Sequence, residues 1–105
     1  MLEQIVKCIR EEDYLYTRHA RHEMETEELG EIKDEEVCEA VLSGKIIEDY
    51  PQDKPYPSCL IYGRTSVGRP LHVVCAYAED GDKVIIITAY QPRLDRWIDF
   101  ERRRP

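Results

Sequence analysis

The sequence lacks the patterns of membrane-spanning and secreted proteins. The longest run of branched aliphatic residues, Val84 to Ile87, is far shorter than the roughly 20 apolar residues that a membrane-spanning helix needs. The N-terminus carries the acidic residue Glu3 and no long apolar stretch, so it does not match a secretory signal peptide. We therefore expect a cytoplasmic protein that does not bind a membrane.

Several short motifs that mark common enzyme classes are also missing. The chain contains no glycine-rich phosphate-binding loop, no GxSxG nucleophile motif and no HExxH zinc motif. The four cysteines form no CxxC pair and are spread along apolar segments, at Cys8, Cys38, Cys59 and Cys75. In a reducing compartment such cysteines behave as small core residues, with a redox or metal role as the alternative. We expect neither a metal nor a cofactor.

The composition is that of one small folded domain. The 105 residues are 42% hydrophobic and 35% charged, which suits a modest apolar core under a well-solvated surface. We therefore predict a single domain over residues 1–105. Within it we distinguish a helical extension over residues 1–13, a core over residues 14–97 and a C-terminal tail over residues 98–105.

Charge is distributed unevenly along the chain. The net charge is −7, but residues 1–53 hold 6 Lys or Arg against 16 Asp or Glu, whereas residues 54–105 hold 9 against 6. The two halves therefore carry −10 and +3, a split that predicts one face that repels anions and another that could bind them. The alternative is that the acidic run is only a solvated helix surface.

The apolar spacing changes from helical to extended at Gly44. Helical spacing predicts helices over residues 2–12, 18–29 and 35–42, the second capped by Thr17 and the third by Asp34. Segments rich in Ile, Val and Tyr then predict four strands, over residues 45–50, 58–65, 71–77 and 83–90. Because short loops favour antiparallel hairpins, the predicted fold class is α+β, with N-terminal helices packed on a four-stranded antiparallel sheet. Residues 14–16 are expected to form an extended connector, and residues 93–104 a terminal helix around Trp97.

Two histidines begin the second predicted helix. His19 and His22 are three residues apart, and Glu23 follows four residues after His19. This spacing resembles part of a metal site, but no third ligand follows at a suitable distance along the chain. The other interpretations are exposed surface histidines and an acid–base role for His19.

His72 interrupts an otherwise apolar predicted strand. Alternation along the strand places its side chain on the outward face, where replacement by alanine would cost no more than about 0.5 kcal/mol. A three-residue turn with Gly81 in the left-handed region would set His72 opposite Thr88, with Tyr90 on the same face. A two-residue turn would instead send Thr88 and Tyr90 to the other face. The plainest alternative is an ordinary outward or edge histidine.

These residue types suit metal-independent cleavage of RNA. In that reaction a base removes the proton of the 2′-hydroxyl, an acid protonates the leaving oxygen, and cations stabilise the charged transition state. Histidine and tyrosine can supply the proton transfers. Arg64 and Arg69, which flank the neighbouring hairpin, can supply the positive charge.

Five segments of the sequence resemble one known family. In chain order they are Thr17–Ala20, Leu42–Gly44, Asp53–Leu60, Gly68–Val74 and Ile86–Pro92. Across about residues 14–97 they resemble the domain-of-unknown-function family DUF4258, which is similar in layout to the RelE-like and barnase-like toxin ribonucleases. That resemblance implies helices before an antiparallel sheet and an antitoxin protein as partner. It also implies that the family's polar positions fall at His19, His72, Thr88 and Tyr90.

We therefore expect a toxin-type, metal-independent endoribonuclease of a toxin–antitoxin pair, with RNA as its substrate. The expected catalytic residues are His19, His72, Thr88 and Tyr90. The expected RNA-binding residues are Arg18, Arg64 and Arg69. The alternative is a non-catalytic module of the same fold that binds protein or nucleic acid.

Overall fold

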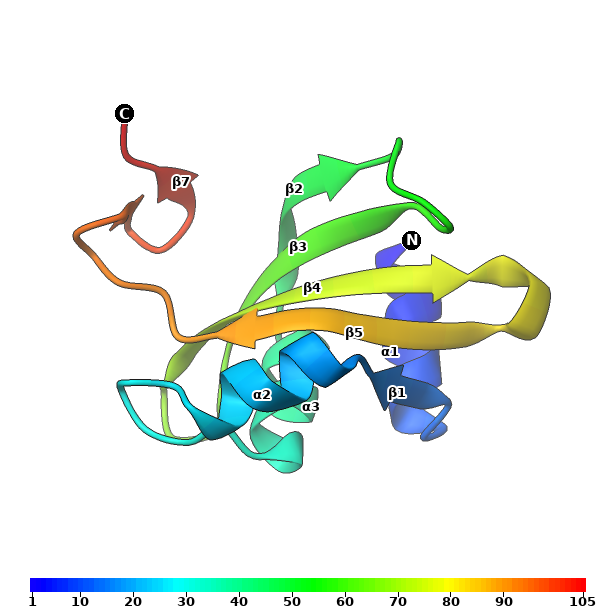
Figure 1. The fold of residues 1–105 in the computed structure, drawn as a ribbon, viewed down its shortest axis with the longest axis horizontal. Helices are drawn as coiled ribbons and strands as arrows, with labels where there is room; N and C mark the ends of the chain where they lie inside the picture. Colours follow the sequence, from blue (N-terminus) through cyan, green and yellow to red (C-terminus); the bar gives the residue numbers. More distant parts are fainter.

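The computed structural model describes residues 1–105. Three helices, α1 (Leu2–Arg10), α2 (Arg18–Glu25) and α3 (Asp34–Leu42), lie on one side of a five-stranded sheet (Figure 1). The strands follow the spatial order β1-β5-β4-β3-β2, and their bounds are Tyr14–Tyr16 (β1), Lys45–Tyr50 (β2), Ser58–Arg64 (β3), Pro70–Ala78 (β4) and Lys83–Tyr90 (β5). We call the sheet face that points away from the helices the outer face. None of the helices has the length and apolar character required to cross a membrane.

The α+β class is confirmed, but the sheet has one strand more than predicted. β1, expected to be a connector, pairs in parallel with β5, so the sheet is mixed and not purely antiparallel. The Val84 amide donates to the Asp13 carbonyl and the Thr17 amide to the Ile86 carbonyl, both at 3.0 Å. Three residues are too few to show the alternation of a strand, and their partner lies about 70 positions away. The sequence pattern therefore could not reveal this pairing.

The helices begin and end close to the predicted positions, with two corrections. The Thr17 hydroxyl caps α2 as predicted, accepting from the Ala20 amide at 3.1 Å. α2 ends at Glu25 and not near Leu29, because the Glu27 carboxylate accepts from the Leu29 amide and so stabilises a turn. Asp34 is the first residue of α3 and not its cap. Its carboxylate instead accepts hydrogen bonds from two phenols, those of Tyr14 and Tyr16.

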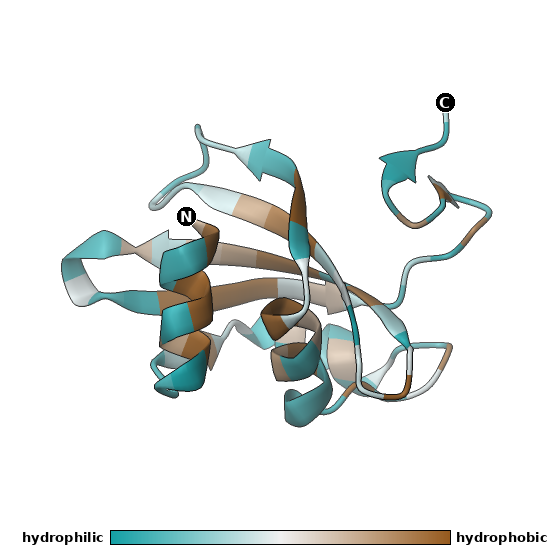
Figure 2. Cartoon of the chain, turned by 180° about the vertical axis from the view of Figure 1, so that it is seen from behind, coloured by the Kyte–Doolittle hydropathy of each residue, from teal (hydrophilic) through white to brown (hydrophobic).

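One apolar cluster fills the space between the helices and the sheet. It takes its members from all three helices and from the inner face of β3, β4 and β5. Figure 2 shows apolar residues on the sides of α1 and α3 that face the sheet. Three of the four cysteines, Cys8, Cys59 and Cys75, are buried in this cluster as free thiols, and Cys38 packs at its margin. The predicted inner face of β4 is also correct, since Leu71, Val73 and Cys75 belong to the cluster.

The turn between β4 and β5 is longer than either alternative that the sequence suggested. A short 3-10 helix, η1 (Glu79–Gly81), follows β4, and Ala78 pairs with Lys83 across the turn. Asp82, not Gly81, adopts the left-handed conformation, with a φ of 46°. The Asp82 carboxylate accepts from the Tyr77 hydroxyl at 2.6 Å and pairs with Lys7 at 3.1 Å, so the turn is also joined to α1.

A β-bulge near the middle of β4 and β5 compensates for the longer turn. The register shifts by one residue between Val74 and Cys75. The longer turn shifts the register by one residue from the predicted three-residue turn, and the bulge shifts it by one more. Because two such shifts restore the alternation of faces, His72, Thr88 and Tyr90 still share the outer face. His72 now lies opposite Tyr90, and Thr88 lies opposite Val74, so the predicted pairing of His72 with Thr88 is wrong.

The last thirteen residues do not form the predicted terminal helix. Residues 93–105, which we call the C-terminal strap, fold back on themselves through two short strands, β6 (Trp97–Ile98) and β7 (Arg102–Arg103). The turn between them places two consecutive residues, Asp99 and Phe100, at φ values of 54° and 62°. Trp97 is buried against the outer face of the sheet. Packing of this ring, and not local helix propensity, decides the conformation of the strap.

We predict that Gly63→Ala destabilises the fold by about 2 kcal/mol or more, because the added methyl group overpacks a tight contact. A Cβ atom on Gly63 would lie 1.8 Å from the Ala40 carbonyl oxygen, where α3 crosses β3. Gly81→Ala is the matched control, since nothing lies within 4 Å of its Cβ position. It should change stability by less than about 0.5 kcal/mol. Urea unfolding of both variants measures the difference, and equal midpoints would contradict the close approach of α3 to β3.

Candidate functional site

His72 is fully buried under the C-terminal strap. Its Nδ1 lies 3.0 Å from the Tyr90 hydroxyl, and its Nε2 lies 2.6 Å from the carbonyl oxygen of Phe100. The Trp97 ring meets the imidazole edge to face, with centroids 4.4 Å apart. The expectation that His72 faces solvent is therefore wrong, because the strap covers this end of the outer face.

The two hydrogen bonds of His72 determine which nitrogen carries its proton. A carbonyl oxygen can only accept, so Nε2 donates to Phe100, and the neutral ring then accepts at Nδ1 from the Tyr90 hydroxyl. Burial lowers the pKa of His72 below its usual value and raises the pKa of Tyr90 to about 12. Near neutral pH the pair is therefore an uncharged imidazole and an uncharged phenol, with the phenol proton directed at the imidazole.

His19 lies on a different part of the molecule. It is on α2, its side chain is 67% exposed, and its Nε2 lies 3.8 Å from a carboxylate oxygen of Glu23. Arg18 and His22 are also exposed on this helix. The structure thus does not join His19 to His72 directly. Each belongs to a separate pair, His19 with Glu23 and His72 with Tyr90.

Two carboxylates of this region were not predicted as site residues. Glu23 accepts from the Ala89 amide at 2.9 Å, and Glu27 accepts from the Gln91 amide at 3.0 Å. Glu23 lies in the last turn of α2 and Glu27 just after its end, and both lie over the edge of β5 that β1 leaves unpaired. Burial raises the pKa of Glu23 above its usual value, against the opposing effects of the Ala89 amide and His19. The spacing of Glu23 from His19 was the one sequence signal of this arrangement.

A cleft of about 800 Å³ lies between α2 and the C-terminal strap. Carboxylates line its α2 side, the Tyr90 phenol lies at the end of β5, and arginines of the strap line the other side. These residues are Glu23, Glu27, Glu28, Tyr90, Arg93, Arg96, Arg103 and Arg104. Arg93 is paired with Glu28 and Asp95, at 3.4 and 3.2 Å. Arg96 and Arg104 are exposed at the cleft without a carboxylate partner, and Arg104 donates through Nε to the Leu94 carbonyl at 2.6 Å. The cleft therefore combines proton-transfer groups with positive charge.

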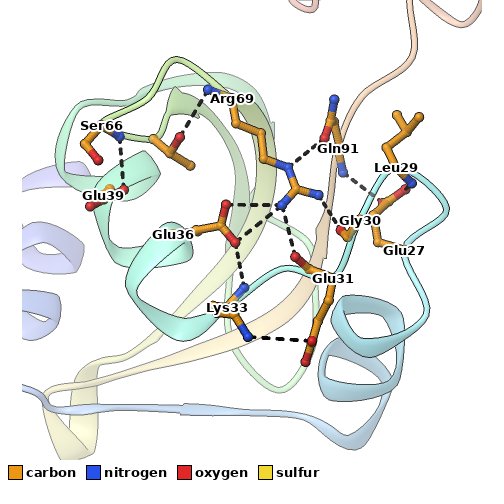
Figure 3. A network of polar contacts seen from close by, with 11 residues as sticks. Glu27, Leu29, Gly30, Glu31, Lys33, Glu36, Glu39, Ser66, Arg69 and Gln91 are labelled. Carbon is orange, nitrogen blue, oxygen red and sulfur yellow. Dashed lines mark hydrogen bonds and ion pairs between the residues drawn. The ribbon is translucent and has the colours of Figure 1, made fainter.

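Arg69, the residue just before β4, holds the fold together and does not line the cleft. Its guanidinium donates to the Glu36 carboxylate, to the Gln91 side chain at 2.6 Å and to two backbone carbonyls, those of Gly30 and Glu31 (Figure 3). Only 15% of the side chain is exposed. A guanidinium bonded in this way has few free N–H groups left for a phosphate.

The remaining predicted residues lie on or near the outer face. Arg64 is exposed, donates to the Gly68 carbonyl at 2.9 Å and lies 5.7 Å from the centre of the Phe100 ring of the strap. Thr88 is half-buried on β5, opposite Val74. No group of three or more His, Cys, Asp or Glu side chains in the structure is arranged to hold a metal ion.

His72→Ala should destabilise the chain by about 2 to 4 kcal/mol, because it leaves a cavity and two unpaired polar groups, the Tyr90 hydroxyl and the Phe100 carbonyl. The cost should be greatest above about pH 6.5. Below that pH the unfolded wild-type chain gains a proton that buried His72 resists, so the wild type loses stability and the alanine variant does not. Urea unfolding at two pH values tests this, with exposed His22→Ala as control. A loss of stability near zero at both pH values would contradict the burial of His72.

Comparison with known proteins identifies the family of the chain. No curated protein and no solved structure matches it. The family model described as a domain of unknown function, DUF4258, matches residues 16–91, a range from the end of β1 to just beyond β5 that includes both candidate pairs and excludes α1 and the C-terminal strap. The chain therefore belongs to the DUF4258 family.

Proposed function

We propose that the chain is a metal-independent endoribonuclease of toxin type, acting in the cleft between α2 and the C-terminal strap. One observation carries this proposal. The cleft has Glu23 on one side, Tyr90 at the end of β5 and strap arginines on the other side, and each of the first two groups is paired with a histidine, Glu23 with exposed His19 and Tyr90 with His72. Cleavage of RNA through its own 2′-hydroxyl requires a base, an acid and positive charge, and no further reagent.

Each group has a defined part in the reaction. His19, oriented by Glu23, removes the proton of the 2′-hydroxyl, and the 2′ oxygen attacks the neighbouring phosphorus. Tyr90 protonates the 5′ oxygen as its bond to phosphorus breaks, with His72 behind it as the source of a replacement proton. Arg96 and Arg104 stabilise the charge on the phosphate oxygens. The products are a 2′,3′-cyclic phosphate and a 5′-hydroxyl.

The layout of the fold gives the proposal additional support. Helices precede an antiparallel β2–β5 meander, an order that resembles the RelE-like and barnase-like toxin ribonucleases. In such a system an antitoxin would bind the protein. The acidic first half of the chain, with its net charge of −10, would favour a basic surface on that antitoxin.

A second candidate function is a binding module without catalysis. The observation in its favour is that two predicted site residues are already fully bonded within the fold. Both ring nitrogens of His72 have partners, and the Arg69 guanidinium has four. Such a module would bind RNA at Arg96 and Arg104 of the strap but would leave the RNA intact.

Cleavage assays separate the two candidates. Full-length protein should cut a single-stranded RNA oligonucleotide in the presence of EDTA, because side chains supply all the chemistry proposed. His19→Ala and Glu23→Gln should each lower the rate by about 10², the scale of losing a general base or its support. His22→Ala, three residues from His19 and also exposed, should leave the rate within about twofold. Mass spectrometry should find the cyclic phosphate.

Three results would contradict the ribonuclease proposal. The first is RNA that binds but stays intact, which favours the binding module. The second is activity that EDTA removes and a divalent ion restores. The third is an equal loss of activity in the His19→Ala and His22→Ala variants.

RNA binding should depend on the strap arginines and not on Arg64. Each phosphate contact with a single strand contributes about 0.7 to the slope of log affinity against log salt, so Arg96→Ala should lower that slope by about this amount. Arg64→Ala removes the same charge from an exposed position outside the cleft and should leave the slope unchanged. Fluorescence anisotropy over a salt series measures both. If Arg64→Ala lowers the slope and Arg96→Ala does not, RNA binds across the β3–β4 hairpin and not in the cleft.

A further inference from the structure

The C-terminal strap lies outside the region that the family model matches, and yet it covers His72, a polar residue inside that region. The match ends at residue 91, two residues before the strap begins. The strap then crosses to the outer face of the sheet, on the side opposite to the helices (Figure 1). There the Trp97 ring and the Phe100 carbonyl cover His72, which is fully buried between them and the sheet.

Much of the strap's attachment is polar and exposed to solvent. Arg103 donates two hydrogen bonds to the Glu48 carboxylate on β2, at 2.8 and 3.0 Å, and Glu101 pairs with Lys45 at 2.6 Å. The Arg103 side chain is 63% exposed and that of Lys45 is 59% exposed, so water and salt weaken both pairs. The turn over His72 also places Asp99 and Phe100 in the left-handed region, which is unfavourable for residues other than glycine.

The strap also fixes the direction of the proton between His72 and Tyr90. Because the Phe100 carbonyl takes the Nε2 proton, Nδ1 must accept, and the Tyr90 hydroxyl points at His72. Tyr90 can then present only oxygen lone pairs to the cleft. With the strap closed, this pair cannot give a proton to a leaving oxygen.

We infer that the C-terminal strap is an autoinhibitory segment that RNA displaces. Arg103 binds the Glu48 carboxylate, and a guanidinium binds a phosphodiester in the same way. RNA in the cleft therefore competes with Glu48 for Arg103. Opening of the strap removes Phe100 from His72 and admits water to the imidazole. The inference rests on the proposed ribonuclease activity for its purpose, but the opening itself can be measured without that activity.

Opening reverses the proton relay. Once hydrated, His72 takes a proton from water and holds one on each nitrogen, so Nδ1 donates to the Tyr90 oxygen and the Tyr90 hydroxyl turns toward the cleft. Tyr90 then gives its proton to the 5′ oxygen as the bond to phosphorus breaks. It recovers a proton from Nδ1, and the imidazolium returns to neutral imidazole. His72 is thus the final proton donor, although it never contacts the RNA.

Chemical modification of the histidines in the full-length protein tests the opening. Diethyl pyrocarbonate should modify exposed His19 and His22 quickly and His72 at least about tenfold more slowly, as followed by mass spectrometry of peptides. Arg103→Glu, which places two carboxylates together, should raise the rate at His72 about tenfold or more. Arg102→Glu makes the same charge change on an exposed neighbour and should not. Combining Arg103→Glu with Glu48→Arg should restore protection.

A DNA oligonucleotide provides a test on the wild-type chain. DNA has the phosphates of RNA but no 2′-hydroxyl, so it can open the strap without being cut. Its addition should raise the modification of His72 about fivefold or more while His22 stays unchanged. If His72 remains protected with DNA bound, the strap is a fixed part of the fold and the inference is wrong, whether or not Arg103→Glu folds.

Cleavage measurements then separate the inference from the proposed function. If the strap opens and no RNA is cut, the ribonuclease proposal fails and the displaceable strap stands. If the wild type cuts RNA while His72 stays protected, the ribonuclease stands and the autoinhibitory strap fails. If both hold, Glu48→Gln, which weakens the hold on the strap and leaves every cleft arginine in place, should cut RNA faster than the wild type.

Discussion

The unpaired edge of β5 is the constraint on which the rest of the site depends. An exposed strand edge presents free amides that must find acceptors or risk pairing with another chain. β1 pairs with the first part of β5, and beyond it Glu23 of α2 and Glu27, just after α2, accept from Ala89 and Gln91. This solution fixes α2 against the sheet. It also places a partly desolvated carboxylate, with His19 beside it, in the lining of the cleft between α2 and the C-terminal strap.

The same constraint explains how a chain of net charge −7 can present positive charge. The carboxylates of the acidic half are not all free at the surface, because Glu23 and Glu27 accept backbone amides and Glu36 pairs with Arg69 (Figure 3). Arg69 thus pairs with one carboxylate of the acidic half, whereas the arginines of the strap stay near the surface. Position in the fold, more than total charge, decides which arginines can meet a phosphate.

His72 connects the stability of the molecule to its proposed chemistry. A buried imidazole with two hydrogen bonds supports the packing of Trp97 and Phe100, and the carbonyl that satisfies Nε2 also sets the proton direction at Tyr90. With the strap closed, these contacts stabilise the structure, but the Tyr90 hydroxyl donates to His72 and no longer to the cleft. Buried Trp97 and two exposed ion pairs together hold the strap, and salt or phosphate weakens the ion pairs while the core stays intact. In the proposed mechanism this difference lets the strap open without unfolding the domain.

The sequence determined the features that depend on residues close together in the chain, because capping and alternation act over a few residues. These features are the α+β class, the limits of most helices and strands, the Thr17 cap and the face that each residue of β4 occupies. It could not determine which distant segments meet. The parallel pairing of β1, the bulge that sets His72 opposite Tyr90, and the strap over His72 all join parts of the chain that are far apart in sequence. Their energies come from edge pairing and from burial of Trp97, which only the assembled tertiary structure provides.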